Sequence, residues 1–156
     1  MGVLNSWLCV VSACGGTLKE VEKSEGVGVY ECSKCGVVVK GEEAEKLQRE
    51  LGLADQFFKR GRDMLLVSPT SASASWGKEA DALRCFQQAL KMRRAKLSPY
   101  HKAIAETEDA IAEVFCRLND FASASKHCAA SIEILTKFFD ENSMVPILPF
   151  PFFFSS

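Results

Sequence analysis

From residue 42 onward, the hydrophobic positions of the chain recur at alternating steps of three and four residues. This spacing is the period of an amphipathic α-helix, and it predicts one long helix with a single apolar stripe. The stripe consists of Ala44, Leu47, Leu51, Ala54, Phe58, Gly61 and Leu65. Residues 68–75 are rich in serine and include Pro69, so they predict a loop after this helix.

Three further helices are predicted after the loop. Leu83, Phe86 and Leu90 mark the second helix, while Ser98 is the expected N-cap of the third, with Pro99 at its first position. The inner face of the third helix is predicted to carry Ile104, Ile111, Phe115 and Leu118, and that of the fourth Phe121, Ala124, Cys128, Ile132 and Leu135. Because the helices are long and their connections short, we expect antiparallel helical hairpins.

The segment before residue 42 has a strand-like pattern instead. Two runs rich in β-forming residues, 27–31 and 37–40, flank the sequence CSKCG at residues 32–36. This arrangement predicts a β-hairpin whose turn carries two thiols. The predicted fold class is therefore mainly α, with a small cysteine-rich β-hairpin of zinc-ribbon type near the N-terminus.

The second and fourth predicted helices share a pattern of small, large and small residues. Ala82, Phe86 and Ala89 are followed 42 positions later by Ala124, Cys128 and Ser131. Such a pattern allows neighbouring helices to approach closely around one bulky side chain, as in tetratricopeptide repeats, whose usual period is about 34 residues. We therefore expect a tetratricopeptide-like array of hairpins, with an unrelated helical bundle as the alternative.

Composition and charge narrow the classes of function. A chain of 156 residues with 47% hydrophobic and 25% charged residues is typical of a globular protein with one main domain. Its net charge of −1 disfavours a nucleic-acid partner, and no apolar run approaches the roughly 18 residues of a membrane span. The sequence MGVLNS at residues 1–6 fits the pattern for N-myristoylation at Gly2, although such short patterns often arise by chance.

The seven cysteines fall into two groups. Cys9, Cys14, Cys32 and Cys35 lie in the first 35 residues, whereas the other three, Cys85, Cys116 and Cys128, lie in apolar helical patterns. We expect these later cysteines to be small core residues. An odd number of cysteines, without a basic residue ahead of the apolar segment 3–13, argues against a secreted disulfide framework. Cytoplasmic or nuclear localisation is therefore expected.

The first group has the spacing of a structural zinc site. Cys32-x2-Cys35 places two thiolates on one turn, at the separation that tetrahedral zinc requires, and Cys9-x4-Cys14 supplies a wider second pair. The predicted ligands are Cys14, Cys32 and Cys35, with Cys9 as the candidate fourth. A closed shell of four thiolates leaves no position for water, so this zinc would be structural. An incomplete site or free thiols are the alternative.

Patterns typical of catalysis are missing from the sequence. His127 and Cys128 are adjacent, so on a helix they point about 100° apart, with Cys128 expected inside and His127 outside, and they do not form a nucleophile–base pair. We find no glycine-rich phosphate loop and no serine nucleophile elbow. The basic residues within 91–96 indicate either a docking surface or, as the favoured interpretation, the solvated last turn of a helix.

Several runs of sequence resemble the C-terminal helical region of SET and MYND domain-containing (SMYD) proteins. They are ADALRCF at 80–86, LSPYH at 97–101, NDFASASKHC at 119–128 and SIEIL at 131–135. The likeness extends to a cysteine-rich segment that precedes these helices in the family and resembles CGG at 14–16 and YECSKCG at 30–36. It covers approximately residues 13–143.

The resemblance implies a family of S-adenosylmethionine-dependent protein-lysine methyltransferases. Their SET domain binds the cofactor and holds the catalytic tyrosine, and a post-SET cysteine cluster binds structural zinc. This chain matches neither the SET motifs nor the MYND finger, so the resemblance implies only a post-SET-like segment, 13–41, and a helical domain, 42–143. Residues 1–12 and the hydrophobic tail 144–156 depart from the family pattern.

The expected function is that of a non-catalytic helical-repeat module that binds a protein partner in the groove between its hairpins. S-adenosylmethionine is expected only in a full-length parent protein. One alternative is part of a methyltransferase that is active when the SET domain is present. The other is an independent enzyme that uses Cys85, Cys116 or Cys128 as a reactive thiol.

Overall fold

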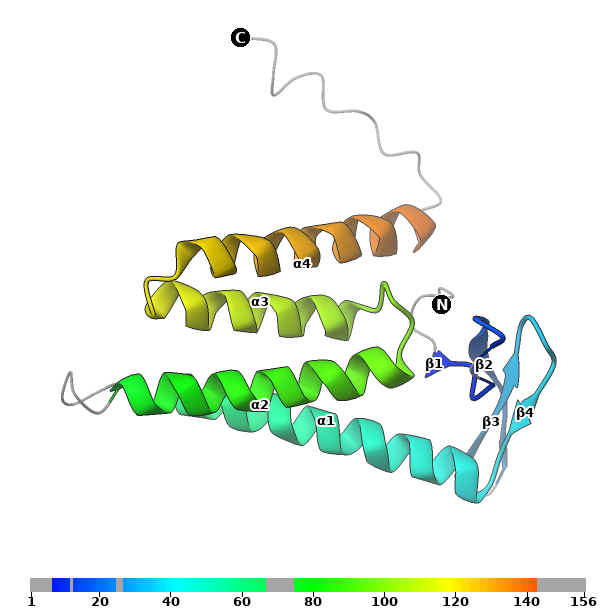
Figure 1. The fold of residues 1–156 in the computed structure, drawn as a ribbon. Helices are drawn as coiled ribbons and strands as arrows, with labels where there is room; N and C mark the ends of the chain where they lie inside the picture. Colours follow the sequence, from blue (N-terminus) through cyan, green and yellow to red (C-terminus); the bar gives the residue numbers. More distant parts are fainter. Residues whose placement is uncertain (1–6, 12, 25–26, 67–74, 143–156) are drawn as a thin grey trace, which may run out of the picture.

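The computed structural model describes residues 7–11, 13–24, 27–66 and 75–142. This part of the chain forms a small antiparallel sheet followed by four helices (Figure 1). The strands are β1 (Trp7–Leu8), β2 (Thr17–Ser24), β3 (Val27–Cys32) and β4 (Val38–Val39). The helices are α1 (Glu42–Leu66), α2 (Ser75–Lys96), α3 (Lys102–Arg117) and α4 (Phe121–Asn142). The prediction of a mainly helical fold with a small N-terminal sheet is confirmed.

Some sequence-based predictions lie outside the described residues. They concern Gly2 as a myristoylation site, the loop at 68–75 apart from Ser75 at the start of α2, and the hydrophobic tail at 144–156. Among the helices that are described, none is both long and apolar enough to cross a membrane.

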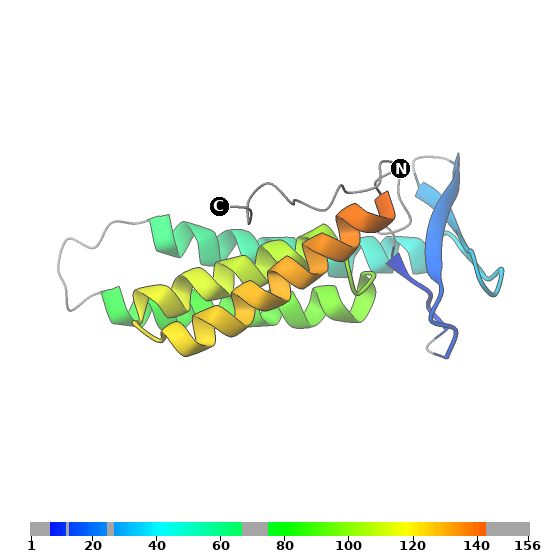
Figure 2. The same cartoon turned by 90° about the horizontal axis from the view of Figure 1, so that it is seen from above.

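The helices lie side by side, and each runs antiparallel to the next (Figure 1). α1 packs along α2, α3 packs along α4, and α2 and α3 join the two pairs. The sheet lies at one end of this layer, beside the start of α1 and the end of α2 (Figure 2). A single bridge between Trp7 and Leu97 connects β1 to the residue that follows α2.

The helical core is centred on Phe86, whose side chain is fully buried. The later part of the predicted stripe on α1 faces this core, where Leu65 packs in the same cluster as Ile111 and Val114 of α3. The start of the stripe, Ala44 and Leu47, packs against the sheet. Gly61 allows the backbone of α1 to lie close to the Phe86 ring, because a Cβ at this position would be 2.7 Å from the ring. A side chain at position 61 would therefore displace the ring on which the core is built.

The sheet is larger than the predicted hairpin. The β3–β4 pair confirms the hairpin, with Tyr30 opposite Val39, but β1 and β2 add two further strands that the sequence did not indicate. β2 has the sequence TLKEVEKS, in which Leu18 is buried and Val21 is exposed. A strand with so few buried side chains lacks the apolar alternation by which strands are recognised.

The third helix begins later than predicted. α3 starts at Lys102, and its N-cap is His101, whose Nδ1 accepts a hydrogen bond of 3.0 Å from the Ala103 amide. Ser98 instead forms a turn, in which its carbonyl accepts a hydrogen bond of 3.0 Å from the His101 amide. Because this turn occupies residues 98–101, the helix begins only after His101, whose ring caps the Ala103 amide.

The predicted inner face of α4 is correct in part. Ala124 is buried and Leu135 packs against the core as predicted, but Phe121, Cys128 and Ile132 are exposed. The other buried positions of this helix are Ser131 and Ile134. Small side chains allow α4 to approach α3 closely, and His127 contributes a polar contact to the same face through the carboxylate of Glu108. Close approach and this polar contact therefore outweigh burial of the larger apolar side chains.

The three later cysteines are not core residues. Cys85 is half-buried, while Cys116 and Cys128 are exposed. The predicted orientations of His127 and Cys128 are reversed, because His127 turns towards α3 to meet Glu108. Cysteine is a small side chain of intermediate polarity, so its presence in an apolar pattern does not determine which face of a helix it occupies.

The basic residues at the end of α2 are not all solvated. Arg93 is buried and donates hydrogen bonds of 2.6 Å to the Asp55 carboxylate and 2.7 Å to the Thr107 hydroxyl. Its guanidinium also lies 4.6 Å from the centre of the Phe58 ring. A buried charge requires such partners, so the interpretation of a uniformly solvated last turn is wrong for Arg93.

Candidate metal centre

The four N-terminal cysteines meet at one side of the sheet. Cys9 follows β1, Cys14 lies in the turn that leads to β2, Cys32 ends β3, and Cys35 lies in the turn before β4. Their sulfur atoms all lie within 4.8 Å of one another. All four predicted ligands are therefore brought together, including Cys9, which the family resemblance does not cover.

Two of the separations between the sulfur atoms are close to those of a tetrahedral zinc site. The Sγ atoms of Cys9 and Cys35 are 3.6 Å apart, and those of Cys14 and Cys32 are 3.7 Å apart. Zinc–sulfur bonds of about 2.3 Å in a tetrahedron give sulfur–sulfur distances of about 3.8 Å. The cluster is therefore compact enough to hold one metal ion, and four thiolates are a donor set that suits zinc.

Glycines shape the turns that carry these cysteines. Gly15 and Gly36 follow Cys14 and Cys35 and have φ angles of 61° and 72°, in the left-handed region that glycine adopts without strain. Gly16 has a different role, because a Cβ there would lie 2.7 Å from the Cys32 sulfur and 3.2 Å from the Cys14 sulfur. The backbone at Gly16 therefore passes so close to the sulfurs that no side chain fits.

The cluster has two halves along the chain, Cys9 with Cys14 and Cys32 with Cys35, and a backbone amide supports each half in the same way. The Val11 amide donates to the Cys9 sulfur and the Lys34 amide donates to the Cys32 sulfur, both at 3.4 Å. In each half, the donor lies two residues after the first cysteine. Amide donors of this kind stabilise negative charge on sulfur and orient the ligand towards a metal.

The thiols differ in acidity. Hydrogen bonds from the backbone at Cys35 and Lys34 lower the pKa of Cys32 to about 6. Burial raises the pKa of Cys9 to about 12 and also raises the pKa of Cys14. In a metal-free cluster Cys32 is therefore the first thiolate at neutral pH, and binding of zinc displaces protons from the remaining thiols.

The metal centre is joined to the helices through a shared core. Cys32 is buried in a cluster with Leu18 and Val39 of the sheet and with Ala44 and Leu47 of α1. Trp7 and Tyr30 pack against the same cluster, with 4.3 Å between their ring centres, and Trp7 also packs against the cluster that contains Leu97. A metal ion here would fix the position of the sheet on the helices. With all four positions taken by protein sulfur, it has no open site for a substrate.

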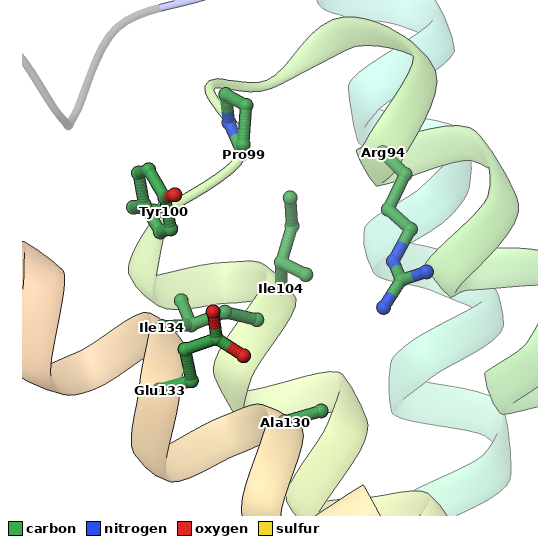
Figure 3. A pocket seen from close by; sticks show the side chains of 7 residues that line it. All are labelled: Arg94, Pro99, Tyr100, Ile104, Ala130, Glu133 and Ile134. Atoms are coloured by element: carbon green, nitrogen blue, oxygen red, sulfur yellow. The ribbon is translucent and has the colours of Figure 1, made fainter.

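A second candidate site lies between three of the helices. A cavity of about 380 Å³ opens at the end of α2, the α2–α3 connection and the facing sides of α3 and α4. Figure 3 shows the apolar side chains of Ile104 and Ile134 between Arg94 on one side and Tyr100 on the other. The full lining is Arg94, Pro99, Tyr100, Ile104, Ala130, Glu133 and Ile134.

A buried carboxylate holds the charged wall of this cavity. The side chain of Glu108 is only 2% exposed, forms an ion pair with Arg94 and makes a hydrogen bond of 2.6 Å with Nδ1 of His127. The His127 ring in turn stacks on Phe115, with 5.5 Å between ring centres. These contacts fix Arg94 at the edge of the cavity. The sequence did not reveal the network, because its members lie on separate helices with no recognisable motif.

A scan against protein-family models finds no family that matches this chain, and searches of curated proteins and of solved structures likewise find no match.

Proposed function

We propose that this chain is a non-catalytic helical-repeat module for protein interaction, whose N-terminal sheet is held in place by a structural zinc ion. The observation that carries this proposal is the cavity between α2, α3 and α4, which combines an apolar floor with one positive and one negative side chain, Arg94 and Glu133. Cavities with this composition suit an extended peptide or a protruding side chain of a partner.

We propose further that the helices form a tetratricopeptide-like array, and the buried small residues of α2 and α4 support this proposal. Ala82 and Ala89 of α2 are buried, and so are the corresponding Ala124 and Ser131 of α4. Small residues at these positions allow successive helices to pack closely, and stacked hairpins present one continuous surface to a partner. The cavity lies on this surface, where α4 faces the end of α2.

The resemblance to SMYD proteins extends the proposal. It favours a chain that corresponds to the C-terminal part of such a protein, located in the cytoplasm or the nucleus, with zinc but without S-adenosylmethionine. The alternative is that these residues serve as part of an active protein-lysine methyltransferase when a SET domain is present. In that case the helices would contribute to substrate binding and not to the transfer of the methyl group.

Selection of peptides on the zinc-loaded full chain would test the interaction function. We expect the selected peptides to lose roughly tenfold or more in affinity for the Tyr100→Ala and Glu133→Arg variants, which alter the cavity. The matched control is Arg84→Ala, because Arg84 is exposed on α2 and pairs only with Asp81 among the described ion pairs. Peptide binding that is unchanged in both cavity variants, or a complete failure to select peptides, would contradict the proposal.

Titration calorimetry with S-adenosylmethionine distinguishes the two readings of the family resemblance. The isolated chain should neither bind this cofactor nor transfer its methyl group to lysine peptides. Stoichiometric binding of the cofactor would show that part of a methyltransferase site is present in the chain.

A further inference from the structure

An apolar stripe runs along the exposed side of α4. Phe121, Ile132 and Phe139 are 65%, 64% and 56% exposed, and Cys128 is exposed between them. On a helix with 100° between residues, these positions lie within about 40° of one another. The neighbouring positions on this side, Ser125, Ala129 and Thr136, are also uncharged. Exposed apolar surfaces of this kind typically mark an interaction site.

The repeat pattern explains why this side of α4 is uncovered. Cys128 occupies the position that corresponds to Phe86 in α2, and Phe86 is fully buried. α2 packs against both α1 and α3, whereas the main contact of α4 within the described residues is with α3 alone. Figure 1 accordingly shows α4 at the edge of the helical layer. Stacked helices need a cover on such a terminal face.

The spacing of the stripe indicates what covers it. Phe121 and Phe139 are equally far from residue 130 along the helix, and so are Cys128 and Ile132. Consider a second α4 that runs antiparallel to the first and is related to it by a two-fold axis at the height of residue 130. This arrangement would place Phe121 against Phe139 of the partner subunit and Cys128 against Ile132 of the partner subunit. A two-fold interface requires such self-complementarity. We infer that the stripe on α4 docks against the same stripe of a second copy of this chain.

The size and charge of the stripe indicate a weak, reversible dimer. The two half-exposed phenylalanines bury on the order of 100 Å² each, and the whole interface buries on the order of 1,000 Å² over both copies, the lower end for specific interfaces. A net charge of −1 gives little repulsion between copies. We therefore expect a dissociation constant in roughly the micromolar range.

Dimerisation through this stripe leaves the cavity open. Ile132 in the stripe and Ile134 in the cavity lining point about 160° apart around α4. The partner subunit and a bound peptide would therefore occupy different sides of the helix. The inference is independent of the proposed peptide binding, and either can fail without the other.

Sedimentation experiments over a range of concentrations test the dimer. Wild-type, zinc-loaded protein should shift from monomer to dimer with rising concentration, and Ile132→Glu should raise the dissociation constant roughly tenfold or more, because it buries a charge at the interface. Leu53→Glu is the matched control, since Leu53 is a similarly exposed apolar residue on α1. A wild-type protein that stays monomeric at every concentration would overturn the inference. So would equal effects of the two substitutions.

Disulfide trapping tests the register. Facing Cα atoms in two packed helices lie about 4–6 Å apart, within reach of a disulfide. In a Cys85→Ser/Cys116→Ser background, the thiol introduced by Ile132→Cys should therefore form covalent dimers with Cys128 of the partner subunit under a mild thiol oxidant. Adding Cys128→Ser should abolish these dimers, because the two introduced thiols would be too far apart. Dimers that persist without Cys128 would overturn the proposed register.

The uncharged tail provides the last control, because its phenylalanines could also cause association. A full-length variant in which Phe152, Phe153 and Phe154 are replaced by serine should dimerise like the wild type. Association that disappears in this variant and persists in Ile132→Glu would assign self-association to the tail and refute the α4 interface.

Discussion

The sheet and the helical layer of this molecule achieve stability in different ways. The sheet includes two strands of only two residues, and its buried cluster consists of Leu18, Cys32 and Val39 together with two residues of α1. The helices share a core with Phe86, Ile111 and Val114 at its centre. Small regions with so little buried surface usually require a disulfide or a metal, whereas packed helices of this length do not.

A metal ion at the cysteine cluster would make the sheet a metal-dependent region beside helices that fold without metal. The two are coupled, because Leu47 of α1 packs beneath the sheet and Trp7 of β1 bridges to Leu97 after α2. Loss of the metal should therefore loosen the end of the helical layer nearest the sheet, while the part around Phe86 stays folded.

The largest effect is expected from removal of the zinc. Cys32→Ser, or a strong chelator, should reduce bound zinc from one equivalent to almost none and unfold the sheet, because structural zinc contributes about 10–16 kcal/mol to folding of small metal domains. The helical circular dichroism signal should largely remain. Metal analysis and amide hydrogen exchange of residues 13–41 would measure both effects.

The matched control for this prediction is Cys116→Ser. Cys116 is an exposed thiol on α3, far in sequence from the cluster, so its replacement should leave the zinc content unchanged. Equal zinc content in wild type and Cys32→Ser would refute the metal centre. Complete loss of helical signal on chelation would instead refute the independence of the two regions.

Phe86→Ala is expected to have the second-largest effect, in the opposite region. Removal of a fully buried phenylalanine typically costs about 3–5 kcal/mol of unfolding free energy. The cost should be high here, because Gly61 and the Phe58 ring leave a cavity that neither can fill. Urea unfolding followed by helical signal would measure the change.

Leu53→Ala is the control for core burial, because Leu53 is an exposed residue of α1 and its truncation should cost no more than about 0.5 kcal/mol. Zinc content should stay at one equivalent in both variants. If Phe86→Ala destabilised the protein no more than Leu53→Ala, the helical core would have to be centred elsewhere.

The sequence predicted those parts of the structure in which one physical requirement dominates. The stripe on α1 was correct because burial alone determines which side of that helix faces inward. The sequence also indicated the four cysteines that lie together, because metal ligands need fixed residue types and spacings. In both cases the requirement is local enough to be visible in the order of the residues.

The errors arose where tertiary contacts override the local pattern. On α4 the contact between His127 and Glu108 turns the apolar stripe outward, and no local signal places Glu108 beside that helix. His101 replaces Ser98 as the N-cap because residues 98–101 form a turn and the His101 ring accepts a hydrogen bond from the Ala103 amide. The sequence did not indicate β2, because this strand contributes few side chains to the core. It did not indicate the burial of Arg93 either, because the partners of Arg93 lie on other helices.

Gly16→Ala should have an intermediate effect confined to the sheet. The added Cβ would contact the Cys32 sulfur and the Lys34 side chain at 2.7 and 2.8 Å, so the two halves of the cluster must move apart. We expect zinc affinity to fall roughly tenfold, as for changes in groups that orient metal ligands. Competition with a chromogenic chelator would measure the affinity, and the stability of the helices should not change.

Gly52→Ala is a suitable comparison for this substitution. Gly52 lies on α1, where a Cβ meets no other atom within 4 Å, so alanine there should leave zinc affinity unchanged and slightly favour the helix. Equal zinc affinity in wild type and Gly16→Ala would show that the backbone at Gly16 is less constrained than its contacts indicate.

The smallest predicted effect concerns Asp120, which caps α4. Its carboxylate accepts hydrogen bonds of 2.7 Å from the Ser123 hydroxyl and 3.1 Å from the Ser123 amide, and these bonds lower the pKa of Asp120 in the folded protein. A lowered pKa adds stability that is present above the unfolded value of about 3.9 and is lost as the pH falls through the folded value. Asp120→Ala should therefore lower Tm slightly at neutral pH and have a smaller effect below about pH 4.

The control is Asp109→Ala, which removes an exposed aspartate within α3. Acid also changes the cysteine cluster, but it does so equally in both variants, so the comparison isolates the effect of the cap. The Tm difference between wild type and Asp120→Ala should shrink between neutral pH and about pH 4. A constant difference would show that the negative charge of Asp120 does not contribute to the cap.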